Sequence, residues 1–113
     1  MAELSKELVD KVYEAVEVAK ATGKIKKGSN EVTKSVEKGT AKLVVIAKNI
    51  SPPEITMHLP ILAKEKGIAC VEVPSKEELG AAAGISVGTA SIAIVDEGDG
   101  KEALKALLQS MKD

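Results

Sequence analysis

Hydrophobic and polar residues at the start of the chain follow a helical spacing. Between residues 3 and 20, apolar side chains fall three or four positions apart with charged residues between them. This spacing predicts an amphipathic helix. The apolar positions are Leu4, Leu8, Val12, Val16 and Ala19. Thr22-Gly23 ends the helix, and residues 24–26 alternate in the manner of a short strand.

Further along, short β-favouring runs alternate with helical segments. Leu43 to Ala47 is continuously apolar, which indicates a strand buried on both faces. Ser51-Pro52-Pro53-Glu54 and Ser75-Lys76-Glu77-Glu78 are capping boxes that predict helix starts, and Pro60 is expected to bend or divide the first of these helices. The predicted helices are 29–38 with a cap at Gly39, one that opens with the prolines after Ser51 and runs to about residue 66, one from the box at Ser75 to Gly84, and a closing helix capped by Asp99 that carries Ala103, Leu104, Leu107, Leu108 and Met111. The predicted strands are 43–47, 70–73 and 90–95. This alternation predicts one α/β domain over residues 1–113, a three-layer α/β/α sandwich around about four strands.

Charge is unevenly distributed along the 113 residues, although the net charge is only −1. Residues 1–19 and 49–113 carry net charges of −3 and −4, whereas residues 20–48 carry eight lysines and two acids, a net charge of +6. All 16 basic residues are lysines, so bidentate guanidinium contacts are not available. The basic third predicts a surface that attracts phosphate groups.

Composition excludes several classes of protein. Tyr13 is the sole aromatic residue, which argues against single-strand binders that stack bases on aromatic side chains. Cys70 is the sole cysteine, so there is no disulfide framework and no thiolate cluster for zinc. Neither a signal peptide nor a membrane-spanning run is evident, and we expect a cytoplasmic, soluble protein that is monomeric when free.

The segment Lys27 to Lys34 carries the most informative chemistry. A glycine turn at Gly28 leads into polar residues that form the first turn of a predicted helix, whose open N–H groups suit a phosphate. Asn30 and Glu31 add an amide and a carboxylate that can read base edges. Taken alone, the same residues also fit an ordinary surface helix capped by Ser29 or Asn30.

Several motifs in order resemble the archaeal ribosomal protein family L7Ae over about residues 22–96. They are the run Gly28–Lys34, Glu37-Lys38-Gly39, Leu43–Ala47, Pro52-Pro53-Glu54-Ile55, His58-Leu59-Pro60, Val73-Pro74-Ser75-Lys76 and Leu79-Gly80. The resemblance implies a mixed sheet and binding to kink-turn RNA in ribosomal RNA and in box C/D and H/ACA guide RNAs. RNase P RNA is a further expected target, and other ribosomal or guide-particle proteins are expected partners.

The resemblance also implies a role for individual residues. Glu31 would read the free edge of a guanine in a sheared G·A pair, with Asn30 and Lys34 on nearby base edges. A second segment, the loop 84–90, would contact a nucleotide flipped out at the kink, and it carries Gly88 where relatives often have proline. The implied RNA-binding residues are Lys27, Gly28, Asn30, Glu31, Lys34, Lys38, Ile55, Lys76, Ile85, Val87 and Ala90. No catalytic residue, metal or cofactor is expected.

Other candidate sites have simpler structural explanations. His58 has no partner of a catalytic triad nearby in sequence, and Cys70 opens an apolar strand, as a buried inert thiol does. Residues 96–100 lack the ligand spacing of a calcium loop and predict a turn. Two alternatives to RNA recognition stay open: a protein-interaction module of the same fold in the translation machinery, and a small α/β enzyme that binds a phosphorylated ligand near Ser29.

Overall fold

The computed structural model describes residues 6–47, 54–85 and 88–111. In chain order the elements are α1 (Lys6–Thr22), β1 (Lys24–Lys27), α2 (Ser29–Glu37), β2 (Leu43–Ala47), α3 (Glu54–Glu65), β3 (Ala69–Val73), α4 (Lys76–Ala82), β4 (Ser91–Asp96), a 3₁₀ helix η1 (Gly98–Gly100) and α5 (Lys101–Met111). Each predicted helix and strand is present within a few residues of its expected bounds.

The four strands form one mixed sheet in the order β1-β4-β2-β3. β4 pairs antiparallel with both β1 and β2, and β2 pairs parallel with β3. The parallel pair is joined by α3, as a parallel connection requires a crossover. Leu43 sits opposite Ile94 on one side and Ala69 on the other, so β2 is a central strand. The predicted mixed sheet is confirmed.

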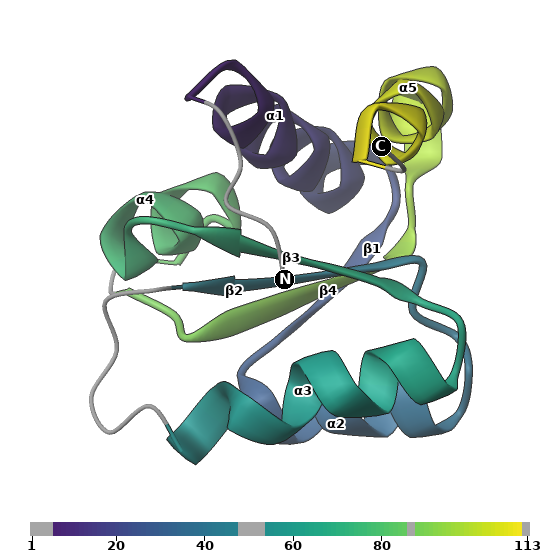
Figure 1. Ribbon diagram of the computed structural model, residues 1–113. Helices are drawn as coiled ribbons and strands as arrows, with labels where there is room; N and C mark the ends of the chain where they lie inside the picture. The colour runs from purple at the N-terminus through teal and green to yellow at the C-terminus, as the bar shows by residue number, and fades with distance from the viewer. Residues whose placement is uncertain (1–5, 48–53, 86–87, 112–113) are drawn as a thin grey trace.

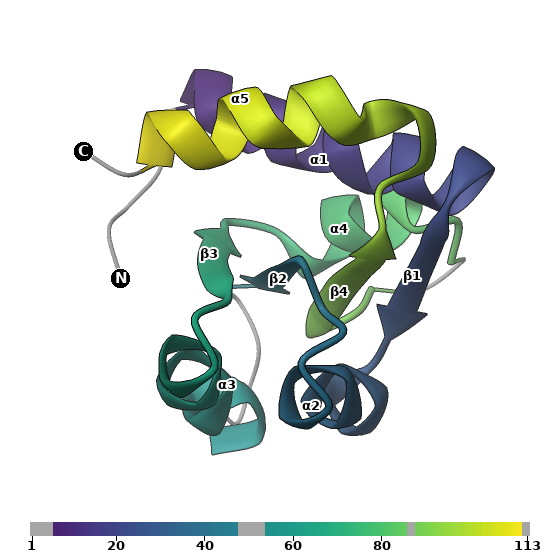
Figure 2. The ribbon, with the colours of Figure 1, turned by 90° about the vertical axis from the view of Figure 1, so that its right-hand side faces the viewer.

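Helices cover both faces of the sheet. Figure 1 shows α1, α4 and α5 on one face and α2 and α3 on the other, and the turned view in Figure 2 separates the same three layers. The predicted α/β/α sandwich is therefore confirmed. The starts of α2, α4 and β4 and the ends of β2 and β3 all lie at the left-hand end of the sheet in Figure 1.

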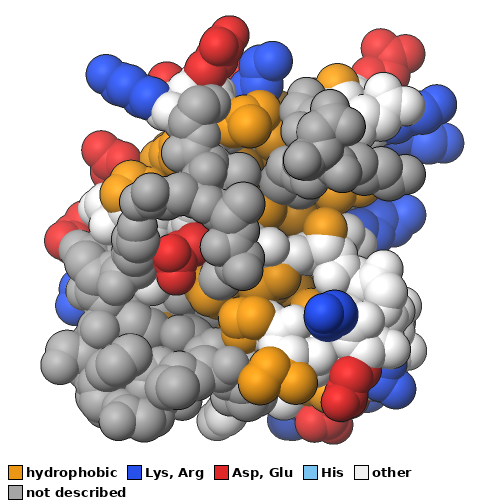
Figure 3. All heavy atoms as spheres, in the orientation of Figure 1, with side chains coloured by type: hydrophobic (Ala, Val, Ile, Leu, Met, Phe, Trp, Pro, Cys, Tyr) orange, Lys and Arg blue, Asp and Glu red, His pale blue; other side chains and the backbone are white. Residues whose placement is uncertain are grey.

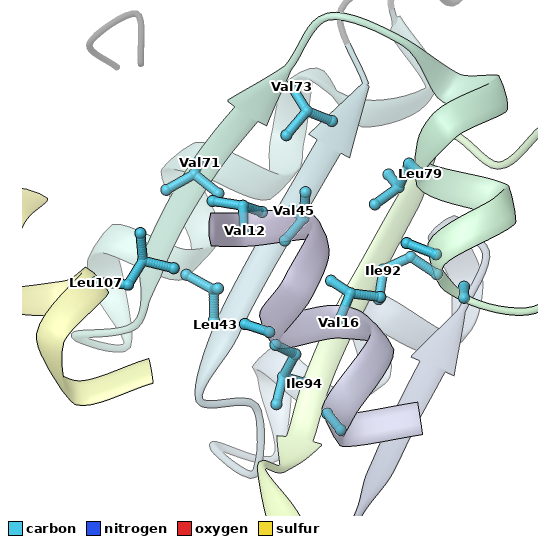
Figure 4. Close-up of a cluster of buried hydrophobic side chains, with 14 of the residues drawn as sticks. Val12, Val16, Leu43, Val45, Val71, Val73, Leu79, Ile92, Ile94 and Leu107 are labelled. Atoms are coloured by element: carbon cyan, nitrogen blue, oxygen red, sulfur yellow. The ribbon is translucent and has the colours of Figure 1, made fainter. Parts of the chain in front are cut away.

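Alternation along the central strands supplies two hydrophobic clusters, one on each face. Leu43, Val45 and Ala47 point into the larger cluster, whereas Val44 and Ile46 belong to the smaller one under α2 and α3. Figure 4 shows the larger cluster, where Val12 and Val16 of α1 meet side chains of β2, β3 and β4. A run with no polar residue was thus required because both faces of β2 are buried.

β3 is an edge strand of the sheet and lies on the side that faces the viewer in Figure 1. Its side chains alternate between buried Val71 and Val73 and half-buried neighbours. In the space-filling view of the same face, hydrophobic side chains gather in the middle, and charged side chains lie both beside them and along the margins (Figure 3).

Two local features add to or differ from the sequence-based expectations. α3 runs without interruption from Glu54 to Glu65 with Pro60 inside it, so of the two expected outcomes, a bend or a division of the helix, the division is wrong. Buried Leu59 and Ala63 on either side of Pro60 pack against the sheet, and this packing offsets the missing N–H bond. The turn expected over residues 96–100 contains η1, and α5 begins directly after it at Lys101. The capping residues Ser51, Pro52 and Pro53 lie outside the described residues.

Candidate functional site

The start of α2 is an open helix end with a glycine at the cap. Gly28 occupies the N-cap position with φ 89° and ψ 149°, and Ser29 is the first helical residue. The interpretation that Ser29 or Asn30 caps this helix is therefore wrong, because the cap residue has no side chain. The first intrahelical bond runs from the Val32 N–H to the Gly28 carbonyl at 2.9 Å. The N–H groups of Asn30 and Glu31 precede it, at the positive end of the helix dipole.

The polar side chains of α2 share its outer face. Asn30, Glu31 and Lys34 are exposed, whereas Val32 and Val36 are buried against the sheet. Lys34 Nζ lies 3.8 Å from Glu31 Oε1, and the two side chains are 65% and 53% exposed. A pair this exposed contributes at most a few tenths of a kcal/mol, about 0.3–0.5 in a helix. The ion pair between Glu31 and Lys34 can therefore break at a small cost in free energy, which leaves both side chains able to contact a ligand.

The loop that follows α4 is anchored by backbone hydrogen bonds. The Thr89 N–H donates to the Lys76 carbonyl at 3.1 Å, and the Ala47 N–H donates to the Ala90 carbonyl at 2.9 Å. Ser75 caps α4 by accepting a bond from the Glu78 N–H at 3.2 Å, as its capping box predicts. Lys76 is thus next to the loop.

A single carbonyl group joins the loop to the start of α2. The Ser91 carbonyl accepts one bond from the Gly28 N–H at 3.1 Å and another from the Thr89 hydroxyl at 3.2 Å. The pairing of β1 with β4, in which Lys27 sits opposite Ile92, brings these residues together. The segment 27–34 and the end of the loop therefore form one continuous surface at one end of the sheet.

Not every predicted site residue lies at this junction. Lys38 is exposed at the C-cap of α2, about 15 Å along the helix axis from Gly28. Ile85 is half-buried and packs against the larger core cluster, so only part of its side chain reaches the surface. Val87 and the side chain of Ile55 lie outside the described residues. Ala90 is half-buried beside the junction.

Two contacts of the site were not predicted from the sequence, one made by Thr89 and one made by Gly88. Thr89 is buried, and its hydrogen bonds hold the loop, but a threonine in a short apolar loop gives no signal of this. Gly88 lies so close to α4 that a methyl group in place of its hydrogen would come within 2.9 Å of Lys76 Cγ. Glycine here therefore allows the loop to pack directly on the Lys76 side chain.

Tyr13 of α1 forms a hydrogen bond to the residue that caps α4, next to the loop. The Tyr13 hydroxyl donates to the Ser75 carbonyl at 3.5 Å, which links α1 to the start of α4. Burial, and next the neighbouring charge of Glu78, raise the pKa of Tyr13 to about 12. Tyr13 is therefore a neutral hydrogen-bond donor over the whole physiological pH range.

Among the described side chains, the remaining candidates do not form a reactive or metal-binding centre, and the side chain of His58 lies outside the described residues. Cys70 is half-buried. Burial, and next the charge of Glu72, raise the pKa of its thiol to about 12, which keeps the thiol neutral and poorly nucleophilic. In the described ranges, no group of three or more His, Cys, Asp or Glu side chains could hold a metal ion. The described helices include none long and apolar enough to cross a membrane.

Comparison with known proteins gives two findings. Residues 10–104 match the model of the ribosomal protein L7Ae/L30e/S12e/Gadd45 family. The structure is similar to that of a 15.5kD RNA binding protein from Giardia lamblia, with a TM-score of 0.94 and 30% sequence identity. That similarity covers 99% of this chain and 93% of the Giardia chain.

Proposed function

The chain belongs to the ribosomal protein L7Ae/L30e/S12e/Gadd45 family, and from this membership we propose that it is an RNA-binding protein that recognises kink-turns. As a member of this family the chain is not an enzyme. The proposal rests chiefly on one observation, the hydrogen bond between Gly28 and the Ser91 carbonyl. This bond brings the exposed polar face of α2 next to the end of the apolar loop, so that a bent RNA could contact both.

Glu31 supplies the sequence readout in this proposal. In a sheared G·A pair, guanine pairs through its sugar edge and leaves donors at N1 and N2 free. A carboxylate has only acceptors, so Glu31 fits these donors and repels a phosphate. The amide of Asn30 and the ammonium of Lys34 lie on the same exposed face and can donate to base-edge acceptors nearby.

The remaining contacts position the RNA. Lys27 is exposed at the end of β1, and Gly28 presents no side chain, so a phosphate can approach the open end of α2 closely. Lys76, Ile85 and Ala90 would contact a nucleotide flipped out of the kink, and the family resemblance adds Val87 and Ile55 to this contact. Lys38 adds a charge further along α2.

Binding and bending are coupled in this mechanism. The α2 face and the loop can be contacted together only when the RNA is sharply bent, so the protein favours the bent conformation by its differential affinity. Ribosomal RNA, box C/D and H/ACA guide RNAs and RNase P RNA are the proposed targets. Other ribosomal or guide-particle proteins would then bind the assembled complex in the cytoplasm.

A gel-shift titration with two RNAs tests the proposal. One RNA carries a complete kink-turn, and the other has both sheared G·A pairs replaced by Watson–Crick pairs. We expect the complete kink-turn to bind at least ten-fold more tightly. Equal affinity for both RNAs would mean that binding is non-specific and electrostatic. Binding of neither RNA would favour the alternative that the protein is a protein-interaction module.

A further inference from the structure

Tyr13 of α1 is the sole aromatic residue of the chain, and its hydroxyl reaches a backbone carbonyl. The side chain is half-buried against the larger core cluster, and the hydroxyl donates to the Ser75 carbonyl at 3.5 Å. The buried residues of this cluster are all aliphatic, so they bury apolar area without a polar group. A partly buried tyrosine needs a hydrogen-bond partner, and here the partner is the residue that caps α4. The hydroxyl therefore distinguishes Tyr13 from the other residues that pack here.

Tyr13 lies beside both ends of the capping box that starts α4. The Ser75 hydroxyl accepts a bond from the Glu78 N–H at 3.2 Å, while the Ser75 carbonyl accepts the bond from Tyr13. Glu78 is close to Tyr13 as well, since after burial its charge is the next cause of the raised pKa of Tyr13. The first turn of α4 is thereby attached to α1.

From the start of α4, hydrogen bonds continue to the start of α2. The Lys76 carbonyl, directly after the capping residue, accepts the Thr89 N–H at 3.1 Å. The Ser91 carbonyl accepts both the Thr89 hydroxyl at 3.2 Å and the Gly28 N–H at 3.1 Å. Together with the Tyr13 bond, these contacts form one hydrogen-bond series that runs from α1 to α2.

The rest of α4 is held in place without the Tyr13 hydroxyl. Leu79 and Ala82 are buried in the larger cluster, and Gly84 lies against the side chain of Lys20 just after the end of the helix. A methyl group in place of the Gly84 hydrogen would come within 2.5 Å of Lys20 Cε, so α1 and α4 approach closely there. Figure 2 shows α4 directly under α1. Loss of the hydroxyl would therefore shift the first residues of α4 and leave the helix packed.

We propose that Tyr13 is a positioning residue for RNA binding, which holds residues 88–91 in place beside the start of α2 through the hydrogen-bond series. This inference rests on the proposed function and deepens it, because α1 carries none of the proposed RNA contacts. The RNA-binding surface then depends on a helix that covers the opposite face of the sheet from α2 (Figure 1).

Tyr13→Phe tests this role, since it keeps the ring and removes the hydroxyl. We expect affinity for the complete kink-turn to fall about two- to ten-fold, the range expected for one ordinary hydrogen bond. Affinity for the RNA without sheared G·A pairs should stay unchanged, because non-specific attraction to phosphates does not depend on the placement of residues 88–91. A purely structural role would change both affinities equally or neither. Gel-shift titrations measure both, at a temperature where circular dichroism shows both proteins folded.

A double-mutant cycle tests whether Tyr13 acts through Thr89. Tyr13→Phe and Thr89→Val interrupt the same series, so the double variant should bind the complete kink-turn as the weaker single variant does, within about two-fold. Lys38→Gln is the matched control, because Lys38 is exposed at the C-cap of α2 and lies outside the series. The fold-changes of Lys38→Gln and Tyr13→Phe should multiply. If the fold-changes of Thr89→Val and Tyr13→Phe also multiply, the inference is overturned.

Failure of the inference can be distinguished from failure of the proposed function. If the unmodified protein does not prefer the complete kink-turn, the proposed function is wrong and the inference falls with it. If that preference is present but Tyr13→Phe keeps both affinities, or lowers both equally, the role of Tyr13 alone is refuted.

Discussion

The N–H of Gly28 donates a hydrogen bond to the carbonyl of Ser91 across 3.1 Å, although the two residues are 63 positions apart in the chain. Ser91 begins β4 and directly follows the loop, and Gly28 is the N-cap of α2. The bond fixes the distance between the two halves of the proposed site. Because the Thr89 hydroxyl donates to the same carbonyl, the loop and the helix cannot move independently without breaking a hydrogen bond.

Thr89→Val tests whether this shared carbonyl organises the site. Valine keeps the shape of threonine but removes the buried hydroxyl, so we expect the free energy of unfolding to fall by about 1 kcal/mol. Affinity for the complete kink-turn should fall further than the loss of stability explains, because the loop is no longer held in a fixed position relative to Gly28. Chemical denaturation and RNA titration measure the two effects. Thr89→Ser keeps the hydroxyl and serves as the control, and equal RNA affinity of both variants would contradict the prediction.

Gly28→Ala addresses the backbone at the start of α2. No atom lies within 4 Å of the position of an added methyl group, so the substitution meets no steric obstacle. Its cost comes from φ 89°, which side chains disfavour by about 1–3 kcal/mol. We expect lower stability by denaturation together with weaker RNA binding, because a methyl group would stand between the helix end and the phosphate.

Gly39→Ala is the control for that substitution. Gly39 has a φ of 73° and also has open space around it, but it lies at the opposite end of α2. We expect a loss of stability, because Gly39 also has a positive φ, with unchanged RNA affinity. If both variants lose the same affinity, the effect at Gly28 is conformational only, and the close approach of a phosphate is not supported.

Local sequence patterns predicted the elements but not the contacts between them. The apolar run from Leu43 to Ala47 and the capping box at Ser75 each depend on neighbouring residues, and both were confirmed. The bond from Gly28 to Ser91 depends on how β1 aligns with β4, which short-range patterns do not specify. The contact between Lys20 and Gly84 likewise follows from the packing of α1 on α4. Tertiary contacts of this kind are decided by the whole fold, so they appear only in the structure.

Cys70 provides a test of burial at the edge strand. Burial and the charge of Glu72 raise the pKa of its thiol to about 12, whereas an unfolded cysteine has a pKa of about 8.5. The neutral thiol therefore stabilises the fold below the unfolded pKa, and this contribution is lost as the pH rises towards 12. We expect alkylation by iodoacetamide at pH 8 to be at least ten-fold slower in the native protein than in denaturant.

The pH dependence of stability gives a second test of the raised pKa. Between pH 8.5 and 10, the free energy of unfolding of Cys70→Ala should fall less than that of the unmodified protein. An equal fall in both proteins would contradict the raised pKa of Cys70.

Glu31 gives the sharpest test of base readout, because charge repulsion and recognition predict opposite signs. Glu31→Ala should weaken binding to the complete kink-turn by about 1–3 kcal/mol in a titration, since the guanine donors lose their acceptor. Glu37→Ala removes another exposed acid from the same helix, near its far end, and should leave affinity unchanged or slightly higher. With the RNA that lacks sheared G·A pairs, both variants should bind at least as tightly as the unmodified protein, because only repulsion is then removed. If Glu31→Ala also tightens binding to the complete kink-turn, its carboxylate is an electrostatic obstacle to RNA, and recognition must come from the neighbouring amide and lysines.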